Sequence, residues 1–487
     1  MDRLPNELLI YLCSWIPKSD LKSFRCCNKV LADAGQNELF RDFEFRLYPS
    51  VHRLYQLGAL AASPIAAKLK TLSFESGILL EYADFRYWQA QIYEERTRLK
   101  YGTWPDSNSH EYKDFHAGLQ ARFGPGMQQQ YNLYRWHLDQ EAELVAKQCS
   151  FQQMLRNMND LAQHCPSVVI KISMAEPKVS LEDVECFDSN LYQHERPEDP
   201  DPRRRVSNRR HHLLDHFTNF LTAAHRSSLH VQDMVMLDVP RQLLNGNTTF
   251  VAETLPEMFA SLRCLDLRIS SFPWSDWLSR SGMDPVYLNG RDPFAQRLRK
   301  LLDCAAKLDK LRLEFPHGKE AEYSFDIFDR TNLNRFPRKF LPSIQHLKLH
   351  RFRCSWEDLK ALLQEASQLR TLTLANCRLE TCSMIDLIQA LPALKLEHVS
   401  ILGEWSVDED QGVWHSHTIH DFASCNAATS YEGPYLSNGL KSRVDEFVVK
   451  GGPSCPLPRW SSFDEDVTRA WELMGDTTWH FIKDDRR

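Results

Sequence analysis

The hydrophobic positions at the start of the chain predict three short helices. Residues 8–16 read Leu-Leu-Ile-Tyr-Leu-Cys-Ser-Trp-Ile and are apolar on nearly every side, and Pro5 stands before them, where a helix can begin without losing a useful N–H. Pro17 ends this first helix. Apolar residues at spacings of three and four predict a second helix over residues 21–31, and the apolar pattern resumes over residues 39–43 on a third.

A unit of this size cannot enclose a helix that is hydrophobic on every side, because domains of about 40 to 60 residues bury too small a fraction of their surface. Part of the first helix must therefore be covered by another body. The sequence leaves two candidates, namely the rest of this chain or a separate protein that receives the helices in a groove.

A Leu-x-x-Leu-x-Leu phrase recurs through the second half of the chain. It falls at residues 262–267, 308–313, 344–349, 369–374 and 391–396. The steps from Leu347 to Leu372 and from Leu372 to Leu394 are 25 and 22 residues. Both steps lie within the period of roughly 20 to 29 residues of leucine-rich repeats, in which a strand and a helix make one turn of a solenoid. The earlier steps are longer and require inserted loops, and weaker phrases at residues 69–74 and 170–172 predict that the array begins early.

The segments between these phrases carry helix signals. Ser355 and Ser383 each open a Ser-x-x-Asp pattern of the capping-box type, followed by leucines at helical spacing. Equivalent helices for the earlier, more irregular units are predicted at residues 212–226 and 293–307. The expected repeat unit therefore consists of a strand, a loop and a capped helix, followed by the strand of the next unit.

Three other segments interrupt or follow the array. Residues of about 82–163 are rich in aromatic side chains and predict a helical insertion, with a turn at the Gly-Pro-Gly of residues 124–126. Residues of about 194–212 predict a disordered, solvated loop, although the arginines within residues 203–210 also fit a nuclear import signal or an anion-binding patch. The tryptophan-rich residues 403–487 predict a C-terminal cap on the last repeat.

Four motifs at the start of the chain carry a family resemblance. They read Leu4-Pro-Asn-Glu-Leu-Leu-Ile-Tyr-Leu, Ile16-Pro-Lys-Ser-Asp-Leu, Phe24-Arg-Cys-Cys-Asn-Lys-Val-Leu and Glu38-Leu-Phe-Arg. In this order and spacing they resemble an F-box of the type common in fungal proteins, and the irregular array resembles the degenerate leucine-rich repeats that often follow one. The expected fold is therefore α/β, with a three-helix F-box at residues 1–46, an irregular leucine-rich-repeat solenoid at 47–402 and the cap at 403–487.

The resemblance implies a function in ubiquitin transfer. An F-box docks onto a Skp-type adaptor, and through it onto a cullin and a RING protein, in an SCF-type ubiquitin ligase. Carried over by motif position, the contacts to the adaptor are Leu4, Pro5, Leu8, Leu12, Ile16, Leu21, Phe24, Lys29, Leu39 and Phe40. The chain would then be a substrate-recognition subunit that tethers a target protein for ubiquitination and makes no bond itself.

The strands of the array would present the target-binding surface. Because strand side chains alternate between faces, residues beside the second leucine of each phrase point away from the core. This places Asp266, Arg312, Lys348, Thr373 and Lys395 in one column, with Cys264, Lys310, His346, Thr371 and Ala393 beside it. The column leans positive toward its C-terminal end, so an acidic or phosphorylated segment is a candidate ligand. The alternative for each residue is an ordinary solvated position.

The composition limits which partners and which cellular compartment are expected for the chain. The chain has 487 residues with 59 basic and 65 acidic side chains, a net charge of −6, so a nucleic acid is not an expected partner. No run approaches the ~20 apolar residues of a membrane span, and no signal-peptide pattern is present. Thirteen cysteines without a Cys-x-x-Cys pair predict reduced thiols in the cytosol or nucleus.

Motifs for catalysis or metal binding are lacking in the sequence. His194-Glu195 begins a zinc-protease pattern, but Glu198 stands where the second histidine belongs, and His415, His417 and His420 have no further ligand at suitable spacing. We therefore expect no cofactor, no metal and no enzymatic activity. Two alternatives to the receptor stay open: an F-box/leucine-rich-repeat interaction protein that binds the Skp adaptor without acting in ubiquitination, and an enzyme with a solenoid accessory region.

Overall fold

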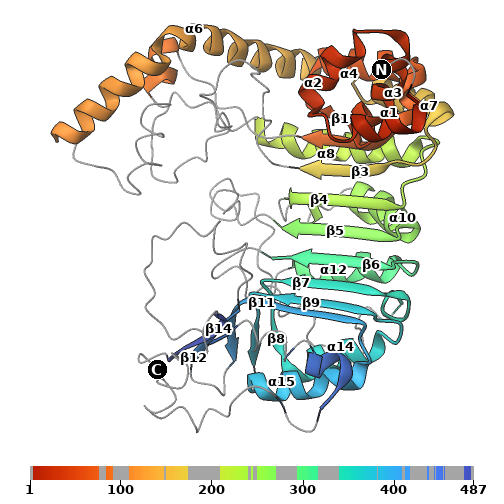
Figure 1. The fold of residues 1–487 in the computed structure, drawn as a ribbon, viewed down its shortest axis with the longest axis vertical. Coiled ribbons are helices and arrows are strands. Elements are labelled where there is room, and N and C mark those ends of the chain that lie inside the picture. Colours follow the sequence, from red (N-terminus) through yellow and green to blue (C-terminus); the bar gives the residue numbers. More distant parts are fainter. Residues whose placement is uncertain are drawn as a thin grey trace. The chain divides into compact units, whose positions relative to one another are not determined.

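The structure is a computed structural model (Figure 1). It describes residues 4–75, 84–90, 109–146, 150–173, 209–239, 243–244, 249–269, 293–315, 339–380, 382–407, 412–416, 436–437, 444, 446–452, 455 and 477–483. The chain divides into two compact units, Met1–Val231 and Gln232–Arg487.

The first unit combines helices with a small parallel sheet. Its elements are α1 (Asn6–Cys13), α2 (Lys18–Arg25), α3 (Lys29–Leu39), β1 (Phe43–Leu47), α4 (Val51–Ala61), the 3-10 helix η1 (Pro64–Lys68), β2 (Leu69–Glu75), α6 (His110–Ala146), α7 (Ser150–His164), β3 (Val169–Ser173) and α8 (Arg209–Arg226). Strand β2 lies between β1 and β3, and all three are parallel. The weak phrases at residues 69–74 and 170–172 therefore do form strands.

The three N-terminal helices share one small core. It consists of Leu9, Cys13, Leu21, Leu31 and Ala34, all at most 5% exposed. The helix boundaries differ from the predicted ones, because the side chain of the residue before α3 caps that helix: the Asn28 carboxamide oxygen accepts a hydrogen bond from the Leu31 N–H at 2.8 Å. The second predicted helix is thus split at this cap. The third predicted helix, over residues 39–43, is wrong, because α3 ends at Leu39 and the strand β1 begins at Phe43.

Helix α6 corrects the expected turn at residues 124–126. The structure has one continuous helix from His110 to Ala146, with the Gly-Pro-Gly inside it. Met127 and Tyr134 on this helix are buried, so packing of the following turns stabilises helical backbone across a sequence with poor helix propensity. The expected loop at residues 194–212 ends earlier than predicted, because helix α8 begins at Arg209. Residues 194–208 lie outside the described part of the chain.

The second unit is built from repeated strands and helices. Its strands are β4 (Asp233–Val239), β5 (Cys264–Ile269), β6 (Lys310–Glu314), β7 (His346–His350), β8 (Arg353–Ser355), β9 (Thr371–Ala375), β10 (Arg378–Glu380), β11 (His398–Val407), β12 (Gly412–Ser416), β13 (Leu436–Ser437) and β14 (Thr477–Lys483). Its helices are the π-helix η2 (Phe250–Thr254), α10 (Leu255–Ser261), α12 (Pro293–Cys304), η5 (Leu341–Ser343), α14 (Trp356–Glu365), α15 (Met384–Ala390) and η6 (Leu391–Leu394).

The leucines of the Leu-x-x-Leu-x-Leu phrases lie in register across a parallel sheet in this unit. Strands β4, β5, β6, β7, β9 and β11 pair in that order (Figure 1). Leu265, Leu311, Leu347 and Leu372 lie opposite one another along the ladder, each at most 3% exposed. Helices α10, α12, α14 and α15 fall between successive strands in the chain. The fold is therefore α/β with a mostly parallel sheet.

The fifth phrase, at residues 391–396, was assigned to the wrong segment. Leu391–Leu394 form the 3-10 helix η6, Lys395 follows with φ 53°, and β11 begins at His398. Pro392 favours the start of a helical turn over a strand, and the buried positions of β11 are Val399 and Ile401.

The segment after the parallel strands forms antiparallel ones. The second half of β11 pairs with β12, and β12 and β13 each pair with β14. Trp405, Trp414 and Trp479 stand on these strands, whereas Trp460 and Trp471 of the predicted cap lie outside the described residues.

Both predicted helix caps are present. The Ser355 hydroxyl accepts a hydrogen bond from the Asp358 N–H at 3.1 Å, and Ser383 and Asp386 form a complete capping box. We expect Ser383→Ala to lower the free energy of unfolding by about 1 kcal/mol. Denaturant unfolding measures this, with Ser367→Ala, at an exposed serine outside both helices, as the control. Equal effects of the two substitutions would contradict a role for the cap.

Candidate protein-binding sites

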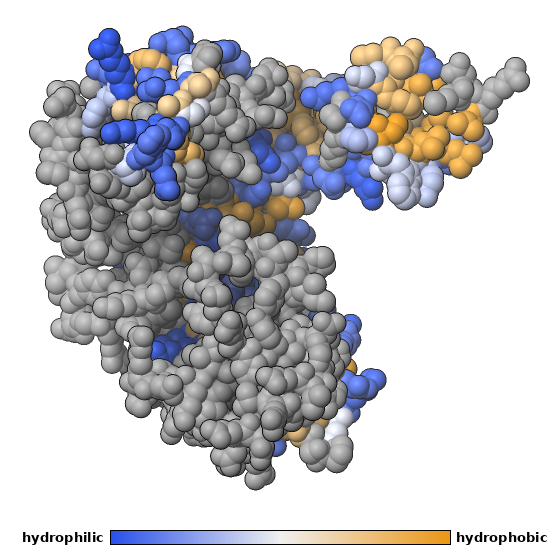
Figure 2. All heavy atoms as spheres, turned by 60° about the vertical axis from the view of Figure 1, so that its left-hand side comes forward, coloured by the Kyte–Doolittle hydropathy of each residue, from blue (hydrophilic) through white to orange (hydrophobic). Residues whose placement is uncertain are grey.

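The first candidate site is the outer face of α1. Leu9 and Cys13 of this helix are completely buried in the bundle core. Leu8, Leu12 and Trp15 are 49%, 42% and 72% exposed, and Figure 2 shows hydrophobic side chains gathered on the surface of this part of the molecule. We name the exposed apolar set the α1 surface; its members are Leu4, Leu8, Tyr11, Leu12, Trp15 and Val30. The sequence-based expectation that this bundle leaves apolar surface uncovered is thus confirmed for the described residues.

The motif residues divide by exposure. Leu4, Pro5, Leu8, Leu12 and Lys29 are exposed. Ile16, Phe24 and Leu39 are half-buried against the bundle core. Phe40 is also half-buried, because its ring packs edge-on against Phe43 at 5.1 Å and lies 6.0 Å from the Lys68 ammonium group.

Leu21 requires a correction. Its side chain is 0% exposed, because it fills the space between α1 and α3, so it cannot contact a partner directly and instead supports the α1 surface from below. Tyr11, Trp15 and Val30 are exposed members of the α1 surface that the motif positions do not include. Tyr11 and Trp15 are one helical turn apart, with ring centroids 6.1 Å apart, and an i,i+4 aromatic pair on an all-apolar helix is a signal that the sequence does carry.

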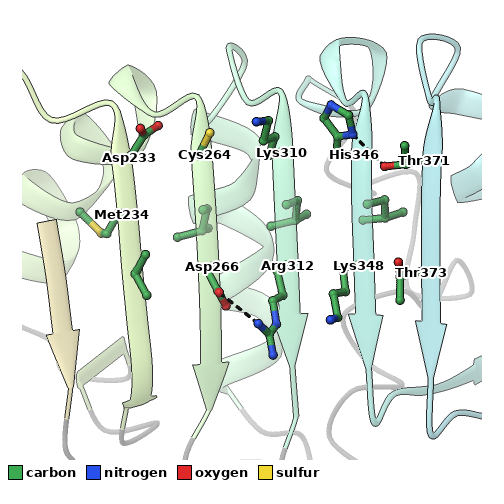
Figure 3. Close-up of a pocket in the computed structure, with 14 residues that line it drawn as sticks. Asp233, Met234, Cys264, Asp266, Lys310, Arg312, His346, Lys348, Thr371 and Thr373 are labelled. Carbon is green, nitrogen blue, oxygen red and sulfur yellow. Dashed lines mark hydrogen bonds and ion pairs between the residues drawn. The ribbon is translucent and has the colours of Figure 1, made fainter. Parts of the chain in front are cut away.

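The second candidate site is the polar face of the sheet in the second unit. Asp266, Arg312, Lys348 and Thr373 pair in register on β5, β6, β7 and β9, as the alternation of strand side chains predicts (Figure 3). Together with the neighbouring row they line a depression of about 260 Å³. The Arg312 guanidinium lies 3.4 Å from the Asp266 carboxylate across the strands.

Lys395 and Ala393 do not belong to this face. Both precede β11, and the register places Ser400 opposite Thr373 and His398 opposite Thr371. The surface therefore does not become more positive toward its C-terminal end. Its cations instead stand on the central strands β6 and β7.

A charge network lies beside the depression, near the C-terminal ends of β5, β6 and β7. The Glu314 carboxylate is 3.1 Å from Arg268, 2.9 Å from Arg312, 3.2 Å from His350 and 3.5 Å from Arg351. Its side chain is only 7% exposed. Burial alone would raise the pKa of Glu314, but the hydrogen bond and charge of His350 and the two nearest arginines outweigh burial and lower the pKa to about 2.

Asp266 shows the opposite balance. Burial raises the pKa of its carboxyl group, and the nearby charges of Arg312 and Arg268 offset only part of that effect. The network thus has the strongly ionised carboxylate of Glu314 at its centre. At its side stands Asp266, whose ionised form is less favoured. This arrangement fixes the orientation of the arginines.

Two observations on the described residues concern metal binding and thiol chemistry. No three His, Cys, Asp or Glu side chains among them are placed to hold a metal ion. His415 stands on β12, whereas His417 and His420 lie outside the described residues. Burial raises the pKa of the Cys354 and Cys377 thiols well above its usual value, which disfavours the reactive thiolate.

Comparison with known proteins gives no assignment. No family model matches the chain, and no curated protein matches it at a significant level. Within the described part of the chain, no helix combines the length and apolar character that a bilayer crossing requires.

Proposed function

We propose that the chain is the substrate-recognition subunit of an SCF-type ubiquitin ligase. In this proposal α1, α2 and α3 are an F-box that binds a Skp-type adaptor, and through it a cullin and a RING protein. The sheet of the second unit is a degenerate leucine-rich-repeat array that binds the target protein. The observation that carries the proposal is the α1 surface, because exposed apolar side chains stand at the motif positions Leu4, Leu8 and Leu12.

The α1 surface offers a partner apolar area that is still open to burial. Full burial of a fully exposed large apolar side chain contributes about 1.5 to 3 kcal/mol. Leu8, Tyr11, Leu12 and Trp15 are 42% to 72% exposed, so together they offer about 3 to 7 kcal/mol before the costs of association. Tryptophan and tyrosine are also the residues that most often dominate interface energies. A groove on a stable partner protein is the surface that fits a short amphipathic or apolar helix.

The proposed mechanism is tethering. The chain forms and breaks no bond; it raises the effective concentration of a target lysine near a ubiquitin-charged enzyme. We place the complex in the cytosol or nucleus, where thiols such as those of Cys354 and Cys377 stay reduced.

Affinity purification of the tagged full chain tests the proposal. The Skp-type adaptor and the cullin are quantified in the eluate by mass spectrometry, and ubiquitin transfer to co-purified proteins is then assayed. Recovery of both subunits with ubiquitin transfer is the expected result. Recovery of the adaptor without cullin would overturn the receptor function in favour of an adaptor-binding interaction protein, and recovery of neither would overturn the F-box assignment.

A further inference from the structure

Two side chains of opposite charge face the same end of the depression. Asp233 stands on β4 and Lys310 on β6, and the register places Cys264 between them (Figure 3). All three line the depression of about 260 Å³. Figure 3 shows them in one row at the same end of their strands.

Neither charge is neutralised within the described part of the chain. The Asp233 carboxylate accepts a hydrogen bond from the uncharged thiol of Cys264, and Lys310 is exposed and forms no ion pair with any described residue. Neighbouring polar groups do have partners of their own: Asp266 pairs with Arg312 at 3.4 Å, and the His346 ring nitrogen lies 2.7 Å from the Thr371 hydroxyl. Asp233 and Lys310 are therefore the charged groups that a ligand can neutralise.

The separation of the two charges suggests the shape of that ligand. Two strand spacings place β4 and β6 about 10 Å apart. In an extended polyproline II segment, side chains three residues apart lie on the same side and about 9 Å apart. A basic and an acidic side chain at this spacing match Asp233 and Lys310.

We propose that the depression binds an extended segment of a target protein in which a basic and an acidic residue stand three positions apart. The basic side chain pairs with Asp233 and the acidic one with Lys310. A run of acidic residues fits less well, because Asp233 repels one of its carboxylates and Arg312 already pairs with Glu314 and Asp266. The inference deepens the proposed function, on which its biological role rests, because it names the class of target segment.

Three short labelled peptides test this site by fluorescence anisotropy at low ionic strength. They share an alanine and proline background and carry Lys/Glu, Lys/Lys or Glu/Glu three positions apart. We expect the wild-type chain to bind the Lys/Glu peptide about fivefold more tightly than either of the others, since one exposed ion pair contributes up to about 1 kcal/mol. Lys310→Glu should transfer the preference to Lys/Lys, and Asp233→Lys should transfer it to Glu/Glu.

The controls make the same charge changes outside the depression. Lys307→Glu and Glu253→Lys, at exposed positions, should keep the Lys/Glu preference. Within the depression, the neutral substitutions Lys310→Gln and Asp233→Asn should each weaken the preference without reversing any charge. A wild-type preference for Glu/Glu, equal shifts in the control variants, or no binding of any peptide would overturn the proposed site. The assay contains no adaptor, so its failure is distinct from failure of docking at α1.

Discussion

Leu8→Asp combined with Leu12→Asp is expected to lower the affinity for the Skp-type adaptor by at least about 100-fold, because a carboxylate buried without a partner costs several kcal/mol. Both leucines are nearly half exposed, at 49% and 42%, so the change removes docking surface while the core residues Leu9 and Cys13 stay in place. Recovery of the adaptor in a pulldown with the tagged chain measures the effect.

The matched control places the same substitution on another exposed hydrophobic residue. Tyr55 on α4 is 66% exposed, and Tyr55→Asp should leave adaptor recovery unchanged. Unchanged thermal unfolding of the double variant confirms that its bundle is folded. Wild-type recovery with the folded double variant would rule out the α1 surface as the docking site.

Glu314→Ala is expected to destabilise the second unit by about 3 to 5 kcal/mol, because it leaves several partly buried cations without their common carboxylate. Arg268, Arg312 and Arg351 each lie within 3.5 Å of Glu314 and are at most 33% exposed. Denaturant unfolding measures the loss. Glu397→Ala breaks an exposed ion pair with Arg370 and should cost less than about 1 kcal/mol; comparable losses for the two variants would contradict the central role of Glu314.

The lowered pKa of Glu314 also makes stability depend on pH. Its pKa is about 2 in the folded chain, against an ordinary value of 4.5, so ionised Glu314 stabilises the fold above about pH 4.5 and this contribution disappears as the pH falls toward 2. The shift corresponds to about 3 kcal/mol. Between pH 5 and pH 2 the wild type should therefore lose about 3 kcal/mol more than Glu314→Gln. Equal losses in both chains would contradict the assignment.

The spacing of the leucines predicted the parallel strands of the second unit, because each buried leucine on those strands faces the core. Leu311, Leu347 and Leu372 face the core from equivalent strand positions, and the capping serines mark where helices begin. The fifth phrase forms no strand, because Leu391 is buried in the 3-10 helix η6 and Leu396 is buried just before β11 begins. Val399 takes the buried strand position instead. Leucine spacing alone does not distinguish a helical turn from a strand.

The candidate sites were predictable to different degrees. An all-apolar helix in a small bundle must expose apolar side chains, so the α1 surface follows from the sequence, whereas the burial of Leu21 depends on how α2 packs. The network around Glu314 joins side chains from β5, β6 and β7 that are far apart in the chain. Only the observed strand register brings them together.

Calorimetric titration of the purified full chain with a purified Skp-type adaptor tests the proposed F-box most directly. We predict saturable binding of one adaptor per chain with a dissociation constant of about 1 μM or lower, which corresponds to roughly 8 kcal/mol. The absence of binding at about 100 μM adaptor, with the chain shown to be folded, would contradict the proposed docking function.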